Sequence, residues 1–156
     1  MNTPHTIECP SCASIGAQKE ASPEAGGFRL SQWPIQIKLI GTIAPFLEGA
    51  DLLVAADCTA FAGPDRFKEA LGNRKVLIGC PKLDNGMQYV EKFTEIFSNM
   101  NIKSVTCLRM EVPCCGGMTA ILREAVKRSG RDIPLTETVL GVKGDLLSER
   151  TVDKEP

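Results

Sequence analysis

The sequence predicts an α/β domain with a mostly parallel sheet and helices on both faces of that sheet. Three short apolar runs have the composition of strands buried on both faces, and they lie at residues 51–56, 75–79 and 102–110. Segments of helical length follow these runs, and this alternation is the pattern of parallel α/β folds. A chain of 156 residues can bury the core of one such domain. These observations favour a three-layer, Rossmann-like architecture.

The chain before the first apolar run is expected to be largely irregular. Residues 1–27 form an arm that is rich in small residues and holds one Cys-x-x-Cys pair. Apolar and polar side chains alternate over residues 35–40, which predicts an extended segment with one buried face. Trp33 is the single tryptophan, and we expect it to pack in the core. Residues 44–50 predict a short helical turn that ends at Gly49.

Two helices are expected around the second strand. The first covers residues 64–71 and has Pro64 in its first turn, where proline is favoured. The second begins after Asp84 or Asn85, either of which can cap it. Its buried stripe has helical spacing and consists of Val90, Phe93, Phe97 and Met100.

The last third of the chain repeats the pattern. The third strand, at residues 102–110, leads to a helix over residues 118–129 with one apolar face. A final strand is expected at residues 138–142. The domain therefore spans residues 28–147, and the polar residues 148–156 are expected to form a frayed tail.

Composition excludes several functional classes. The formal net charge of -1 gives no electrostatic reason to expect nucleic acid or an acidic membrane as a partner. No apolar run reaches the roughly 18 residues that span a bilayer. The N-terminus has no signal-peptide pattern, so we expect a cytoplasmic protein. The single histidine, His5, leaves histidine-based zinc catalysis and Ser-His-Asp chemistry without support.

The seven cysteines carry the main functional signal. An odd number in a reducing compartment argues for metal or redox chemistry over a disulfide framework. Cys58 follows the first strand, Cys80 follows the second, and Cys114 and Cys115 follow the third. Because parallel strands share one carboxyl edge, these thiols are expected to lie close together. Four thiols can hold an iron–sulfur cluster, whereas Cys107 lies inside the third strand and is expected in the core.

The complete ligand set stays open on sequence grounds. Adjacent residues of an extended strand point in opposite directions, so Cys114 and Cys115 reach one site only if the chain turns between them. The flanking proline and glycine favour such a turn. If only one of the pair is a ligand, Cys9 or Cys12 from the arm can supply the fourth sulfur. Arg109 is either a group that offsets cluster charge or a solvated surface residue.

Four segments of the sequence resemble the C-terminal domain of ferredoxin-type 4Fe-4S-binding proteins of anaerobic bacteria and archaea. The resemblance extends over about residues 28–147, and its motifs are LSQWP at 30–34, GADLLVAADC at 49–58, GCPKLD at 79–84 and MEVPCCGG at 110–117. It implies an iron–sulfur redox protein of anaerobic metabolism. The family-type cysteines that it carries over are Cys58, Cys80, Cys114 and Cys115.

The chain departs from that family at its N-terminus. Members carry a ferredoxin module with two cysteine-rich motifs, whereas only Cys9 and Cys12 stand there in this sequence. The resemblance therefore implies that electrons come from another protein, such as a ferredoxin or a flavoprotein.

The leading hypothesis is a [4Fe-4S] redox protein that transfers electrons or serves as a subunit of a redox enzyme. A structural zinc site of four thiolates is the first alternative, although such sites usually combine two close cysteine pairs. The second alternative is a thiol enzyme with Cys114 or Cys115 as its nucleophile, for which the sequence offers no histidine base. A substrate is not implied by any of these patterns.

Overall fold

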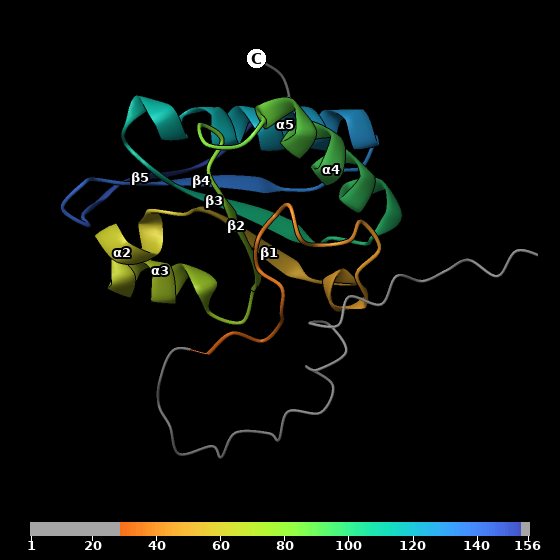
Figure 1. Ribbon diagram of the computed structural model, residues 1–156, viewed down its shortest axis with the longest axis horizontal. Helices are drawn as coiled ribbons and strands as arrows, with labels where there is room; N and C mark the ends of the chain where they lie inside the picture. Colours follow the sequence, from red (N-terminus) through yellow and green to blue (C-terminus); the bar gives the residue numbers. More distant parts are fainter. Residues whose placement is uncertain (1–28, 154–156) are drawn as a thin grey trace, which may run out of the picture.

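The computed structural model describes residues 29–153 as one five-stranded sheet with helices on both faces (Figure 1). The strand order is β2-β1-β3-β4-β5. Four strands are parallel, and β5 runs antiparallel to β4 at the edge. The strands are β1 (Asp51–Ala56), β2 (Lys75–Gly79), β3 (Ser104–Met110), β4 (Leu135–Leu140) and β5 (Leu146–Thr151). The predicted mostly parallel α/β fold is thereby confirmed. The predicted arm at residues 1–27, with Cys9 and Cys12, lies outside the described residues.

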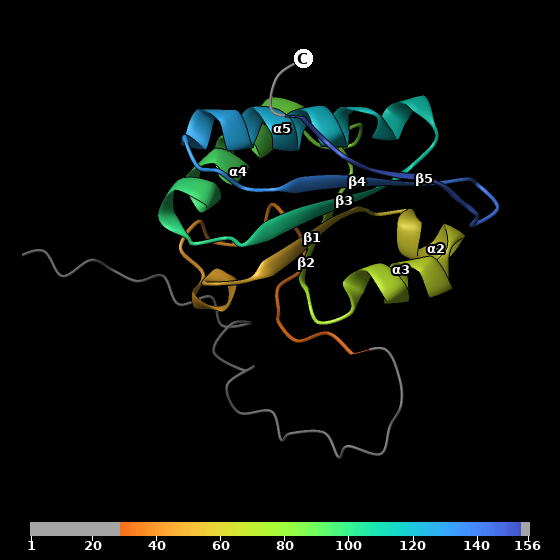
Figure 2. The same ribbon diagram turned by 180° about the vertical axis from the view of Figure 1, so that it is seen from behind.

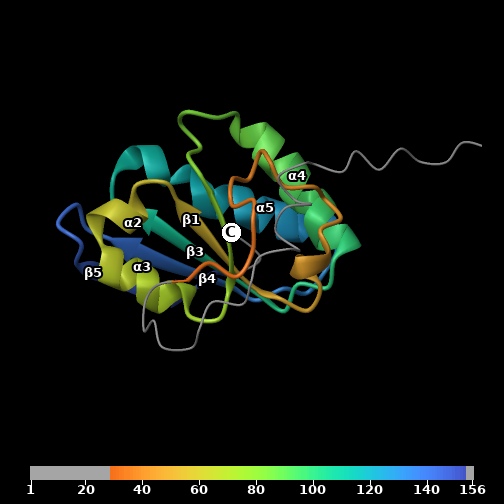
Figure 3. The ribbon, with the colours of Figure 1, turned by 60° about the horizontal axis from the view of Figure 1, so that its bottom comes forward.

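The helices form the two outer layers. On one face lie α4 (Gly86–Asn99) and α5 (Gly117–Ser129), which pack against each other. On the other face lie α2 (Thr59–Ala62) and α3 (Pro64–Leu71), as Figures 2 and 3 show from behind and from below. Among the described residues, no helix is long and apolar enough to cross a membrane.

The core is divided by the sheet because successive strand residues face opposite layers. On β1, Leu52 and Val54 belong to the apolar cluster beneath α4 and α5. Leu53 and Ala55 belong to the cluster beneath α3. Cys107 is fully buried in the first of these clusters, so its predicted core position is confirmed.

The helix ends follow the local signals in the sequence. The Asn85 side chain accepts hydrogen bonds from the backbone amides of Met87 and Gln88 at 2.9 and 3.3 Å, which caps α4. Gly130 stands at φ +68 and ends α5, because a left-handed residue at this position favours glycine. A short 3-10 turn, η2 (Pro45–Leu47), precedes Gly49 as predicted.

The segment before β1 differs from the prediction. Gln36 makes one isolated bridge to Ile78, and the chain then turns, which leaves Leu39 68% exposed. Trp33 is 48% exposed, so its predicted core position is wrong. Instead, Gln32 is buried, and its amide donates to and accepts from the backbone of Val76 on β2. A side chain that pairs with an edge strand in this way leaves no apolar pattern in the sequence.

The C-terminal prediction also needs correction. Residues 148–151 do not form a frayed tail but the last four residues of β5, and every residue of that strand is exposed. An edge strand can be polar because its backbone hydrogen bonds to one neighbour hold it in place. The strand predicted at residues 138–142 is β4, and it begins earlier, at Leu135. The prediction missed this start because Glu137, in the middle of the strand, interrupts the apolar pattern of the sequence.

Candidate functional site

Three adjacent strands bring their cysteines to the carboxyl edge of the sheet. β1 lies between β2 and β3, and its last residue, Ala56, is paired with Gly79 at the end of β2. Cys80 follows directly after Gly79, and Cys58 comes two residues after β1. Cys114 and Cys115 belong to a 3-10 turn, η3 (Pro113–Cys115), that connects β3 to α5. The predicted common edge of these segments is therefore confirmed.

Three of the thiols are close enough to Cys115 to affect it electrostatically. Burial raises the pKa of the Cys115 thiol, and negative charge on Cys114, Cys58 and Cys80 raises it further. A hydrogen bond from the backbone of Met110 opposes this rise. Cys58 and Cys114 are exposed, Cys80 is partly buried, and Cys115 is 3% exposed. The arrangement thus combines a buried thiol with others that face the solvent.

The chain turns at the vicinal pair, as predicted from the flanking proline and glycine. The amide of Cys115 donates to the carbonyl of Val112 at 3.0 Å, and that of Gly116 donates to Pro113 at 3.2 Å. Because the two cysteines lie in a turn and not in an extended strand, the alternation rule for strands does not separate them. One thiol is nevertheless exposed and the other buried.

Tyr89 on α4 fixes the end of β2. Its hydroxyl accepts a hydrogen bond from the amide of Cys80 at 3.2 Å and donates one to Asp84. Burial and the neighbouring Asp84 carboxylate raise the pKa of Tyr89. The ring fits here because Gly79 has no side chain; a Cβ at this position would lie 2.3 Å from the Tyr89 hydroxyl. A glycine at a strand end was the sequence signal that could have revealed this close contact.

The end of β1 carries an unusual carboxyl group. The Asp57 amide donates to the Gly79 carbonyl at 3.0 Å, which holds the residue beside β2. Its Oδ1 atom is buried and has no hydrogen-bond partner among the described residues. Burial, together with the nearby Asp84 carboxylate, raises the pKa of Asp57. The edge therefore has an acceptor atom that a donor or a cation could satisfy.

A buried ion-pair network connects β3, β4 and β5, and it was not predicted from the sequence. Glu137 is 2% exposed, and Arg109 and Arg150 donate to its two oxygens at 3.0 and 2.8 Å. Burial alone would raise the pKa of Glu137, but hydrogen bonds from Thr119 and the two arginines lower it to about 2. Arg109 also donates to the Met110 carbonyl at 3.0 Å. It is therefore neither a solvated surface residue nor a free counter-charge for the cysteines.

Among residues 29–153, no three histidine, cysteine, aspartate or glutamate side chains are grouped so that they could hold one metal ion. The donor set at the edge is nonetheless chemically selective, because four thiols suit zinc, copper(I) or iron–sulfur clusters and disfavour harder cations.

Fold and site together define an open-sheet α/β protein with four cysteines at the carboxyl edge of the sheet, where such sheets bind ligands. The chain belongs to the Rossmann-like domain family, whose model matches residues 44–155. It is similar to an uncharacterized protein of Archaeoglobus fulgidus, with 30% identity over 115 residues. That match covers 74% of this chain and 81% of the archaeal protein. No solved structure matches the chain.

Proposed function

We propose that the carboxyl edge binds a [4Fe-4S] cluster through Cys58, Cys80, Cys114 and Cys115, and that the protein transfers electrons or serves as a subunit of a redox enzyme. The observation that carries this proposal is that three adjacent parallel strands lead into these four cysteines at one edge of the sheet, where Cys58, Cys80 and Cys114 raise the pKa of Cys115. A thiol whose pKa is raised by neighbouring thiols gains most when a cationic centre binds the group as thiolates.

The positions of the cysteines along the sequence favour a cluster over a structural zinc ion. One zinc ion needs all four sulfur atoms at about 2.3 Å from a single point. Structural zinc sites usually combine two close Cys-x-x-Cys pairs, and the described residues contain no such pair. A cubane cluster attaches each cysteine to a different iron, so its ligands stand further apart.

The surrounding residues would hold the thiolates and tune them. The backbone of Met110 would stabilise negative charge on Cys115, since it already forms a hydrogen bond to that sulfur. Tyr89 would fix the Cys80 backbone through its hydrogen bond to the amide. When bound, the cluster would supply one-electron redox chemistry.

The exposed side of the site suits exchange with a partner protein. Cys58 and Cys114 are both exposed, so a ferredoxin or a flavoprotein could approach this edge closely. We propose such a protein as the electron donor, with the reaction taking place in the cytoplasm of an anaerobe.

The thiol-enzyme alternative has weaker support. A nucleophilic cysteine reacts as its thiolate and therefore needs a lowered pKa. The pKa of Cys115 is instead raised by burial and by its neighbours. Cys114 remains as the only nucleophile of that hypothesis.

Anaerobic purification of the full chain, followed by iron and sulfide analysis and electron paramagnetic resonance after reduction, tests the proposal. We expect about four iron atoms per chain and a signal that is lost or altered when any of Cys58, Cys80, Cys114 or Cys115 is changed to serine. Cys107→Ala is the matched control, because this cysteine is buried in the core and should not alter the signal. Colourless protein with one bound zinc would contradict the proposal. Changes at Cys9 and Cys12 decide whether the arm supplies a ligand.

A further inference from the structure

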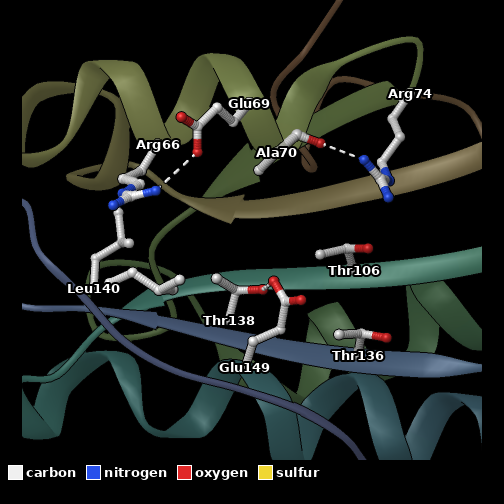
Figure 4. Close-up of a pocket in the computed structure, with 10 residues that line it drawn as sticks. Arg66, Glu69, Ala70, Arg74, Thr106, Thr136, Thr138, Leu140 and Glu149 are labelled. Atoms are coloured by element: carbon white, nitrogen blue, oxygen red, sulfur yellow. Dashed lines mark hydrogen bonds and ion pairs between the residues drawn. The ribbon is translucent and has the colours of Figure 1, made fainter.

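A cleft lies between α3 and the sheet, away from the cysteine edge in the sense that no described cysteine lines it (Figure 4). Its volume is about 330 Å³, within the range of small-molecule sites, which starts near 300 Å³. Its lining includes Arg66, Arg74, Thr106, Thr136, Thr138 and Glu149. Nothing in the cysteine chemistry accounts for this cleft.

The cleft exists because one face of the sheet changes from apolar to polar. Phe67 and Leu71 of α3 belong to the apolar cluster that also contains residues of β1 and β2. That cluster continues through Leu108 and Met110 of β3, but nearer the amino ends of β3 and β4 the same face presents Thr106 and Thr136, which are register partners. Their partly buried hydroxyl groups make this part of the face polar and able to hydrogen-bond a ligand.

One end of the cleft has hydrogen-bond donors without partners. Arg74 donates through Nη1 to the Ala70 carbonyl at 2.8 Å, but its Nε atom is buried and has no partner. Among the described residues, the hydroxyls of Thr106 and Thr136 also make no hydrogen bond, and Arg74 makes no ion pair. Figure 4 shows these three side chains at the same end of the cleft. A guanidinium and two hydroxyls at one end of a cleft are chemically complementary to an oxyanion.

The middle of the cleft has the opposite character. Glu149 on β5 is the register partner of Thr138 and accepts a hydrogen bond from its hydroxyl at 3.2 Å. Arg66, by contrast, is already paired with Glu69 at 3.1 Å. A carboxylate acceptor at this position suits the hydroxyl groups of a ligand, and no aromatic side chain lines the cleft to stack on a flat ring.

We propose that this cleft binds a small hydroxylated oxyanion, with its phosphate or carboxylate group on Arg74, Thr106 and Thr136 and its hydroxyl groups on Glu149. The buried Nε of Arg74 then gains the partner that it lacks in the free protein. Recognition at both ends distinguishes such a molecule from a simple anion.

Isothermal titration calorimetry on the full chain at low ionic strength, with glycerol 3-phosphate, glycerate, inorganic phosphate and glycerol as probes, tests this site. The first two probes distinguish a phosphate from a carboxylate, and we expect at least one of them to bind more tightly than inorganic phosphate. Glycerol should not bind. The proposal is overturned if neither hydroxylated anion binds to the wild-type protein.

Variants assign the binding to the cleft. Arg74→Gln should weaken the affinity for the anion by about tenfold to a hundredfold, which is the usual effect of losing a charge-assisted hydrogen bond. Arg74→Lys, which keeps the charge but not the Nε donor, should fall between Arg74→Gln and wild type. Arg128→Gln is the matched control, since Arg128 is an exposed partner of Glu124 on another helix. Equal affinities of Arg74→Gln and Arg128→Gln, with both variants folded by circular dichroism, would place the anion elsewhere.

Glu149→Gln tests the second half of the proposal. Loss of the carboxylate should remove the preference for the hydroxylated anion, while binding of inorganic phosphate stays the same or becomes tighter. If the preference survives this change, Glu149 does not recognise the hydroxyl groups and that assignment is wrong.

Discussion

Replacing the buried Glu137 by glutamine should lower the free energy of unfolding near neutral pH. Hydrogen bonds from Thr119, Arg109 and Arg150 hold the pKa of this carboxyl at about 2, against an ordinary value of 4.5. A pKa lowered by folding gives stability that is complete above about 4.5 and is lost as the pH falls through about 2. The difference of about 2.5 between the two pKa values corresponds to about 3 kcal/mol of folding stability near neutral pH, because one pKa unit equals about 1.4 kcal/mol.

Urea unfolding followed by circular dichroism, from neutral pH down to about pH 3, measures this contribution. Wild-type protein should lose stability over that range, whereas Glu137→Gln should start lower and lose less. Glu124→Gln is the matched control, because Glu124 is an exposed helix residue paired with Arg128 at 2.7 Å, and its urea midpoint should hardly change. A loss below about 1 kcal/mol for Glu137→Gln, or a pH dependence parallel to that of wild type, would refute the reasoning.

Three further substitutions test the packing around the site and the core by thermal or urea unfolding. Gly79→Ala should destabilise the protein by about 1–3 kcal/mol, because its methyl group would lie 2.3 Å from the Tyr89 hydroxyl. Gly41→Ala is the control: no atom lies within 4 Å of the added methyl group, so its stability should be close to that of wild type. Asn85→Ala should lose about 1 kcal/mol with the cap of α4, and an unchanged midpoint would argue against the capping role. Leu122→Ala empties a fully buried position on α5 and should lose about 2–5 kcal/mol.

The sequence predicted those elements in which local and tertiary signals agree. The strands at residues 51–56 and 75–79 and the helix at residues 64–71 have the predicted bounds, because apolar runs and Pro64 mark them directly. The edge strand β5 was missed because every one of its residues is exposed, so no buried face marks it. Its position depends on backbone pairing with β4, which a single sequence does not reveal.

The same distinction applies to the candidate site. The common edge of the cysteines was predictable because it follows from parallel strands alone. The unpartnered oxygen of Asp57 and the burial of Glu137 were not predictable, since each depends on residues far away in the sequence. Polar side chains in those positions look like solvent-facing residues until the strand order is known.

The strand order also shows why the connecting loops matter more for this site than the strands. Neighbouring strands lie about 4.8 Å apart, so β2 and β3, on either side of β1, end about 10 Å from each other. Thiols directly on those two strand ends could not meet at one group unless the chain turned inward. Such a turn exists after β3, where η3 (Pro113–Cys115) buries Cys115, and after β2, where the Asp84 amide donates to the Cys80 carbonyl at 2.9 Å. Substitutions that loosen either turn should therefore disturb the cysteine arrangement even though they leave the sheet intact.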